Sequence, residues 1–135
     1  GAFDPVAALA GVCEREGMWL HVDGSWGGSV LLSEMHRGVL DGLDRADSFA
    51  WNPHKMMGVP MQCSAFMARH RDILKEVNGL SAPYLFQQDK NFASLDLGDN
   101  TIQCSRRNDV FKLWLMWKAY GDRELGARVE HAVGR

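Results

Sequence analysis

The feature that most constrains the fold is the alternation of short apolar runs with segments of helical spacing. The runs 18–23, 48–51 and 62–68 have the length of strands, and the segments between them repeat apolar residues at helical intervals. Such alternation is typical of βαβ units, in which helices join parallel strands. We therefore predict an α/β fold with a mostly parallel sheet flanked by helices.

Five segments are predicted to be helical from the spacing of their apolar residues. They are 4–16, 36–47, 72–77, 109–120 and 123–133. The first has Pro5 in its first turn and Gly17 as its stop, and Gly121 separates the last two. Periodicity fails between 79 and 105, so we predict irregular structure there.

A residue with a reactive side chain lies at the end of one apolar run, and another lies shortly after the end of a second run. Asp23 closes the first run and precedes a glycine-rich stretch, 24–28, in which the glycines allow the backbone to approach a ligand closely. Lys55 follows the second run in a turn, because Pro53 prevents the simple continuation of a central strand. Each residue alone has an ordinary alternative, a turn or helix cap for the aspartate and a solvated amine for the lysine. Because open α/β sheets bind ligands at the carboxyl ends of their strands, we expect both residues beside one planar ligand.

Four stretches of the chain resemble the group II pyridoxal-phosphate decarboxylases, in the glutamate and cysteine-sulfinate decarboxylase branch. They are 19–28, 46–64 (ADSFAWNPHKMMGVPMQCS), 84–90 (YLFQQDK) and 103–117 (QCSRRNDVFKLWLMW). The resemblance implies the aspartate aminotransferase-like fold I with an antiparallel strand after the lysine, a homodimer, and release of the α-carboxylate of an amino acid as carbon dioxide. It also implies that residues 1–135 are the C-terminal half of the large, pyridoxal-phosphate-binding domain, without its upstream half and without the small C-terminal domain.

The resemblance also implies roles for individual residues. Lys55 would hold the aldehyde of pyridoxal 5'-phosphate as a Schiff base, and Asp23, as a buried carboxylate, would keep the pyridine nitrogen protonated. His54 would donate to the cofactor phosphate, with a histidine satisfied by the local backbone as the alternative. Asn52 is similar to a phosphate-contacting asparagine of some members. Ser25 stands where the family usually has a small alanine packed on the ring.

One loop departs from the family pattern. Many members carry a tyrosine there that returns a proton to the α-carbon, whereas this chain has Asn91-Phe92-Ala93-Ser94. Phe92 falls at or beside the tyrosine position; Ser94 or a water is an alternative donor, and Phe92 would then be packing for a closed lid. The missing hydroxyl supports a second interpretation, a catalytically degenerate homologue kept as a dimer partner or cofactor binder. Retention of Lys55 and Asp23 argues against that interpretation.

The resemblance predicts decarboxylation of a small acidic amino acid, namely glutamate, cysteine sulfinate or aspartate, and a group II decarboxylase of another amino acid is the alternative. Arg106 and Arg107 are either contacts for a substrate carboxylate or phosphate, or ordinary ion-pair residues. The role of His21 is open. Three residues of the helix 109–120 are predicted to pack in the core or a dimer interface rather than to bind a cofactor: Trp114, Met116 and Trp117.

Composition argues against other partner classes. The formal net charge of −2 disfavours a nucleic-acid or membrane surface. No apolar run approaches the ~20 residues needed to cross a bilayer. The cysteines, Cys13, Cys63 and Cys104, are odd in number and lack metal-ligand spacing. We therefore expect reduced thiols in a cytoplasmic protein and no metal site.

Overall fold

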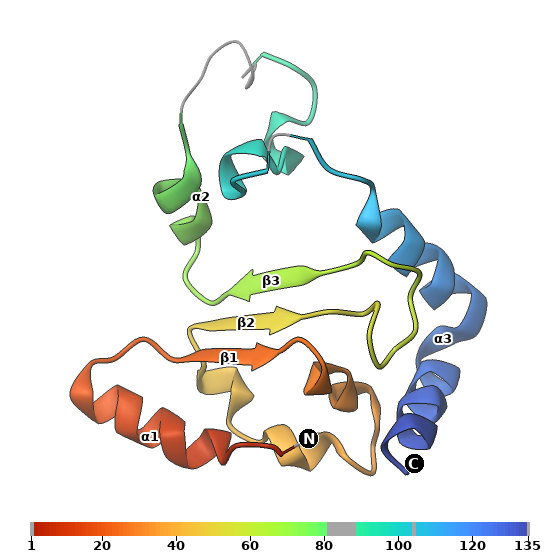
Figure 1. Ribbon diagram of the computed structural model, residues 1–135. Helices are drawn as coiled ribbons and strands as arrows, with labels where there is room; N and C mark the ends of the chain where they lie inside the picture. The colour runs from red at the N-terminus through yellow and green to blue at the C-terminus, as the bar shows by residue number, and fades with distance from the viewer. Residues whose placement is uncertain (1, 81–88, 104, 135) are drawn as a thin grey trace. The chain divides into compact units, whose positions relative to one another are not determined.

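The computed structural model describes residues 2–80, 89–103 and 105–134, apart from the side chain of Ser94. It divides into two compact units, a larger one of residues 1–69 with 108–135 and a smaller one of residues 70–107. The larger unit holds the sheet and two helices, α1 (Val6–Glu16) and α3 (Asp109–Val133), and the smaller unit holds the short helix α2 (Ile73–Asn78) (Figure 1).

The sheet has three strands, in the order β1 (His21–Gly24), β2 (Ser48–Trp51) and β3 (Ala65–Ala68). β1 pairs parallel with β2, and β2 pairs antiparallel with β3. All three predicted strands form, although β1 and β3 are shorter than their apolar runs. The antiparallel strand after the lysine is confirmed, so the described sheet is mixed rather than mostly parallel. The reason is that β3 follows β2 through a loop, which lets adjacent strands run in opposite directions without a crossover helix.

One predicted helix, 36–47, is wrong. The segment forms two short 3-10 helices, η2 (Arg37–Leu40) and η3 (Leu43–Arg45), separated by Gly42. Gly42 has a φ of 89°, and a Cβ there would lie 2.6 Å from the Cα of Ala7. The chain therefore turns sharply where it meets α1 (Val6–Glu16), and a continuous helix is not possible.

The two helices predicted at the end of the chain are confirmed as the two halves of α3 (Asp109–Val133). The side chain of Asn108 caps the first half by accepting a hydrogen bond from the N–H of Phe111 at 3.2 Å. Gly121, with φ 70° and ψ 173°, breaks the helical backbone between the halves.

The smaller unit holds α2 (Ile73–Asn78), which confirms the predicted helix 72–77 within one residue at each end. None of the described helices is long and apolar enough to cross a membrane.

The core of the larger unit lies against α3. One buried cluster joins α3 to the segment between β2 and β3, which contains Lys55 and is called the lysine loop (residues 52–64). Its buried members are Met57, Val59, Cys63, Met116 and Leu125. Trp117 packs against this cluster, so core packing is confirmed for Met116 and Trp117, whereas Trp114 is exposed. A second buried cluster joins the rest of the unit to the end of α3: Val6, Val30, Leu40 and Val129.

The glycines that follow Asp23 serve packing inside the chain. A Cβ at Gly24 would lie 2.2 Å from Cε2 of Phe49, and one at Gly28 would lie 2.6 Å from Cζ of the same ring. Phe49 is buried on the core side of β2. Gly24 and Gly28 therefore allow close approach to a core aromatic ring, and the approach to a ligand expected of this stretch stays a prediction.

Gly24→Ala should destabilise the protein by about 1–3 kcal/mol, because its methyl group overpacks a filled site. Phe49→Val removes the ring atoms that this methyl group would meet. The double variant should therefore be more stable than the sum of the two single effects predicts. Denaturant unfolding of the four proteins measures this coupling, and strictly additive effects would contradict the packing explanation.

Candidate active site

β1 pairs parallel with β2, so the two strands end at the same edge of the sheet. Asp23 near the end of β1 and Lys55 in the turn after β2 therefore lie at that edge. Ser25 connects them. The Nζ of Lys55 donates a hydrogen bond to the Oγ of Ser25 at 3.2 Å. The N–H of Ser25 donates to Oδ1 of Asp23 at 2.9 Å. An amine and a carboxylate from distant parts of the sequence are thus joined by one small residue.

The carboxylate of Asp23 has a pKa below its ordinary value. The hydrogen bond from the Ser25 hydroxyl is the main cause, followed by that from the Ser25 N–H, with smaller contributions from the charges of His21 and Lys55. A hydroxyl donates once and accepts twice, so Ser25 can serve Asp23 and Lys55 together. Asp23 is exposed among the described residues, whereas the sequence predicted a buried carboxylate. Its burial would have to come from surfaces other than the described residues of the larger unit.

Lys55 lies in the predicted turn, which its own backbone helps to close. Its N–H donates to the carbonyl of Asn52 at 2.9 Å, and its carbonyl accepts from the N–H of Gly58 at 3.0 Å. Pro53 is buried and accepts a hydrogen bond from the N–H of Val59 at 3.0 Å. These contacts form a compact loop in which Pro53, Met57 and Val59 are buried and the side chain of Lys55 points to Ser25.

His54 shows the backbone contact that the sequence left as its alternative role. Its Nδ1 lies 2.6 Å from the carbonyl oxygen and 3.1 Å from the N–H nitrogen of Cys63. The N–H of His54 also donates to that carbonyl at 3.4 Å. Nδ1 is thereby held by the backbone, and a ligand would contact Nε2.

The burial of Cys63 raises the pKa of its thiol, and the neighbouring charge of Asp109 adds to this.

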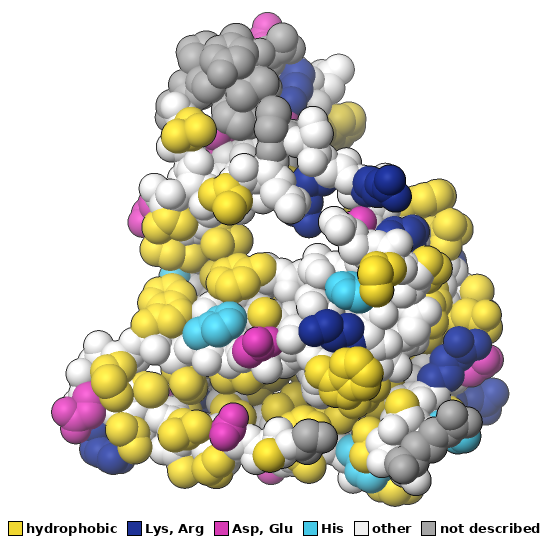
Figure 2. Space-filling view, viewed as in Figure 1, with side chains coloured by type: hydrophobic (Ala, Val, Ile, Leu, Met, Phe, Trp, Pro, Cys, Tyr) yellow, Lys and Arg dark blue, Asp and Glu magenta, His cyan; other side chains and the backbone are white. Residues whose placement is uncertain are grey.

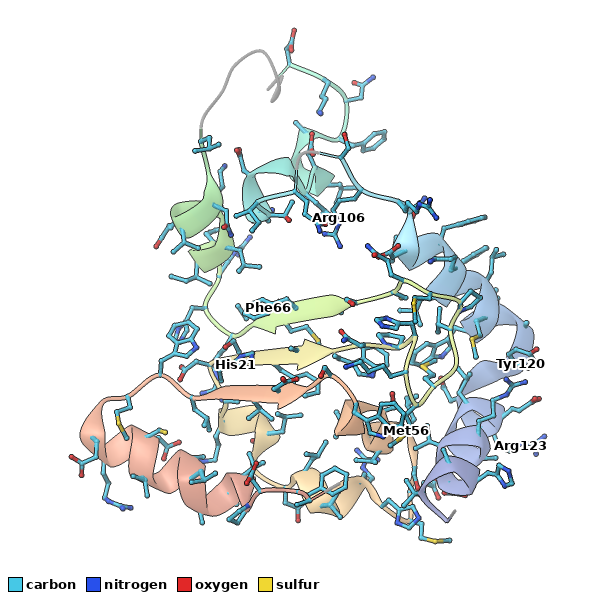
Figure 3. The ribbon with its side chains drawn as sticks, viewed as in Figure 1. His21, Met56, Phe66, Arg106, Tyr120 and Arg123 are labelled. Carbon is cyan, nitrogen blue, oxygen red and sulfur yellow. The ribbon has the colours of Figure 1, made fainter. Side chains whose placement is uncertain are left out.

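The exposed face of the sheet adds Phe66, which sequence reasoning missed, and places it beside His21, whose role the sequence left open. His21 points to the same face as Asp23, and its ring stacks on Phe66 of β3 with centroids 5.7 Å apart (Figure 3). Nδ1 of His21 lies 2.8 Å from Oγ of Ser48, which anchors the ring. Figure 2 shows hydrophobic and histidine side chains side by side over this sheet. Period-2 alternation along β3 is the sequence signal that could have placed Phe66 there.

An open concavity of about 990 Å³ runs along β1 in the larger unit. Asp23 and Ser25 line it, together with His21, Trp26 and Met56. Its volume is at the upper end of the range of ligand sites. Among the described residues, no group of three His, Cys, Asp or Glu side chains is placed to hold a metal ion.

The loop without a tyrosine belongs to the smaller unit. Phe92 is 79% exposed, has a φ of 61° and precedes the 3-10 helix η4 (Ala93–Leu95). An ion pair between Lys90 and Asp96 spans the loop, and Asp96 also accepts a hydrogen bond from the N–H of Gly98 at 2.9 Å. Phe92 is thus presented to solvent by a closed turn.

The other predictions on this unit stay predictions. Arg106 and Arg107 are exposed. The side chain of Ser94, residues 84–88 of the YLFQQDK stretch and Cys104 lie outside the described residues.

Comparison with known proteins identifies the relatives of the chain. Residues 1–134 match the family described as "Pyridoxal-dependent decarboxylase conserved domain". The chain is 57% identical over 134 residues to human cysteine sulfinic acid decarboxylase and 56% identical over 135 residues to bovine acidic amino acid decarboxylase GADL1, with 98% of the chain covered in both cases. It spans 27% and 26% of the length of these two relatives. The crystal structure of mouse CSAD matches 99% of the chain and 28% of its own length, with a TM-score of 0.90 and 53% identity.

Ser25→Ala should raise the pKa of Asp23 toward the ordinary carboxyl value, because it removes the hydrogen bond that lowers this pKa most. The carboxylate of the variant would then protonate at a higher pH than that of the unchanged protein. Carboxyl ¹³C shifts of the cofactor-free protein, labelled at aspartate, report the midpoint, and Asp23→Asn identifies the resonance. Ser25→Thr keeps a hydroxyl and is the matched control. An unchanged midpoint in Ser25→Ala would show that the hydroxyl does not hold the carboxylate.

Proposed function

Because the chain belongs to the pyridoxal-dependent decarboxylase family, we propose that the full-length protein removes the α-carboxylate of a small acidic amino acid as carbon dioxide. Its cofactor is pyridoxal 5'-phosphate, and its candidate substrates are glutamate, cysteine sulfinate and aspartate. The observation that carries the proposal is the hydrogen-bonded path from Lys55 through Ser25 to Asp23. The identity to relatives named for cysteine sulfinic acid and acidic amino acids supports the substrate class.

The proposal extends to the architecture of the whole protein. Residues 1–135 would be the C-terminal half of the large domain of fold I, in a cytoplasmic homodimer. The span, about a quarter of the relatives' length, and the TM-score of 0.90 to mouse CSAD support the assignment to one part of a larger fold. The cytoplasmic location and the dimer rest on the sequence alone. An exposed Asp23 agrees with this, because the remaining surfaces of the site would come from the rest of the protein.

The residues present fit the cofactor. When bound, pyridoxal phosphate supplies a conjugated ring that takes up the electron pair left by the departing carbon dioxide. Lys55 offers the amine that holds an aldehyde carbon, and it is kept beside Ser25. Asp23, anionic at neutral pH, can hold a proton at the pyridine nitrogen. Enclosure of Asp23 by the rest of the protein would lower the local dielectric constant and strengthen that ion pair.

His54 and Asn52 would position the phosphate group. Nδ1 of His54 is held by the backbone of Cys63. In the tautomer whose Nδ1 accepts the N–H of Cys63, Nε2 carries the ring proton and would donate to an anion. Asn52 is half-buried beside the turn and its carbonyl accepts the N–H of Lys55. Ser25 is small, and would leave room for a ring between the amine and the carboxylate.

The test is product analysis of the full-length protein offered glutamate, aspartate and cysteine sulfinate separately. We expect release of carbon dioxide and the corresponding amine from at least one of them. Lys55→Ala should abolish both turnover and the borohydride-trapped adduct at the peptide that contains residue 55. Trapping that persists in Lys55→Ala would refute the role of the lysine, and inactivity toward all three acids would refute the substrate class.

Phe92 generates a separate prediction. If Phe92 stands where a tyrosine donates the proton, a measurable fraction of turnovers should end in an aldehyde product and in loss of active cofactor. Phe92→Tyr should suppress the aldehyde and prolong activity, because general-acid help is worth ~10² to 10⁴ in rate. Phe111→Tyr, at another exposed phenylalanine, is the control. Stable turnover without aldehyde, unchanged by Phe92→Tyr, would instead assign the proton to Ser94 or a water.

A further inference from the structure

The ammonium group of Lys112, on the first half of α3, lies among oxygens of the lysine loop. Its Nζ donates a hydrogen bond to the carbonyl of Pro60 at 3.1 Å and another to the carbonyl of Gln62. These carbonyls are 52 and 50 residues away in sequence. Lys112 therefore fastens the far end of the lysine loop to α3.

Asp109, one turn before Lys112, belongs to the same cluster. It is 7% exposed, and its Oδ1 lies 3.6 Å from Nζ of Lys112 without a hydrogen bond among the described residues. Its backbone carbonyl accepts a weak hydrogen bond from the thiol of Cys63 at 3.7 Å. The carbonyls of Pro60 and Gln62, rather than the carboxylate, are thus the hydrogen-bonded partners of Lys112.

The segment that Lys112 holds is the one that holds His54. Cys63 directly follows Gln62, and its backbone contacts both Nδ1 and the N–H of His54. His54 in turn directly precedes Lys55. A short series of contacts therefore leads from α3, through the end of the lysine loop, to the two residues proposed to bind the cofactor.

We propose that Lys112 is a positioning residue of the active site, which fixes His54 and Lys55 by drawing the carbonyls of Pro60 and Gln62 onto α3. Lys112 itself touches no reacting group. The inference rests on the proposed function only in that His54 and Lys55 bind pyridoxal phosphate. Its structural part, the anchoring of the lysine loop, stands without it.

The experiment compares Lys112→Met with Lys118→Met, a matched exposed lysine on the same helix, in the full-length protein. The first readout is amide hydrogen exchange of peptides covering residues 52–64 in the cofactor-free protein. The second is the affinity for pyridoxal phosphate, followed by borohydride trapping at Lys55. Lys112→Met should speed exchange of the lysine loop and weaken cofactor affinity about tenfold, since charge-assisted hydrogen bonds are lost. Lys118→Met should match the unchanged protein, and Lys112→Arg, which keeps the charge and the donors, should recover most of the affinity.

A double variant separates positioning from charge balance. If Lys112 only neutralises the buried Asp109, then Asp109→Asn combined with Lys112→Met should restore both readouts, and that recovery would overturn the proposal. We expect no recovery, because the carbonyls of Pro60 and Gln62 stay unheld. Should Lys112→Met fail to fold, Lys112→Gln takes its place with the same expectation.

Two further outcomes are decisive. Unchanged exchange and unchanged affinity in the Lys112 variant would also overturn the proposal. If the unchanged protein traps no cofactor at all, the proposed function fails, and the exchange of the lysine loop still decides whether Lys112 anchors it.

Discussion

Burial of the lysine loop against α3 holds the candidate site in place. Met57, Val59 and Cys63 pack on Met116 and Leu125, which lie more than fifty residues further along the chain. The hydrophobic contact is non-directional, so it brings the loop to α3 without setting its orientation. Hydrogen bonds from Lys112 to two backbone carbonyls supply the direction. Together they hold the loop from which the side chain of Lys55 reaches Ser25.

The four residues of β1 divide between the exposed face of the sheet and the core. Along β1, the side chains of His21 and Asp23 point to the exposed face of the sheet, while Val22 and Gly24 face the core. Successive residues of a strand point to opposite faces. The surroundings of Asp23 are therefore set on the exposed face, and those of Gly24 are set by packing in the core. Gly24 is required by the ring of Phe49, and Asp23 is held by Ser25.

The order of apolar residues predicted a helix or strand correctly where contacts within that segment decide its conformation. The strand 48–51 and the break at Gly121 are confirmed, because apolar runs and a glycine stop act over a few residues. The helix predicted at 36–47 failed, although Val39, Leu40 and Leu43 have helical spacing. Contact with α1 at Gly42 overrides that spacing, and such a contact is invisible in a local window.

The sequence alone singled out Lys55 and Asp23 as candidates, because one lies in a proline-containing turn and the other at a strand end, within stretches that resemble the family. It also placed both at strand ends that a parallel pair brings together. Only the tertiary structure decided that Ser25 bridges them, that Phe66 stacks on His21, and that Lys112 holds the loop. Apart from the local hydrogen bond between Ser25 and Asp23, these contacts join residues far apart in the chain, and their geometry follows from packing that no periodicity encodes.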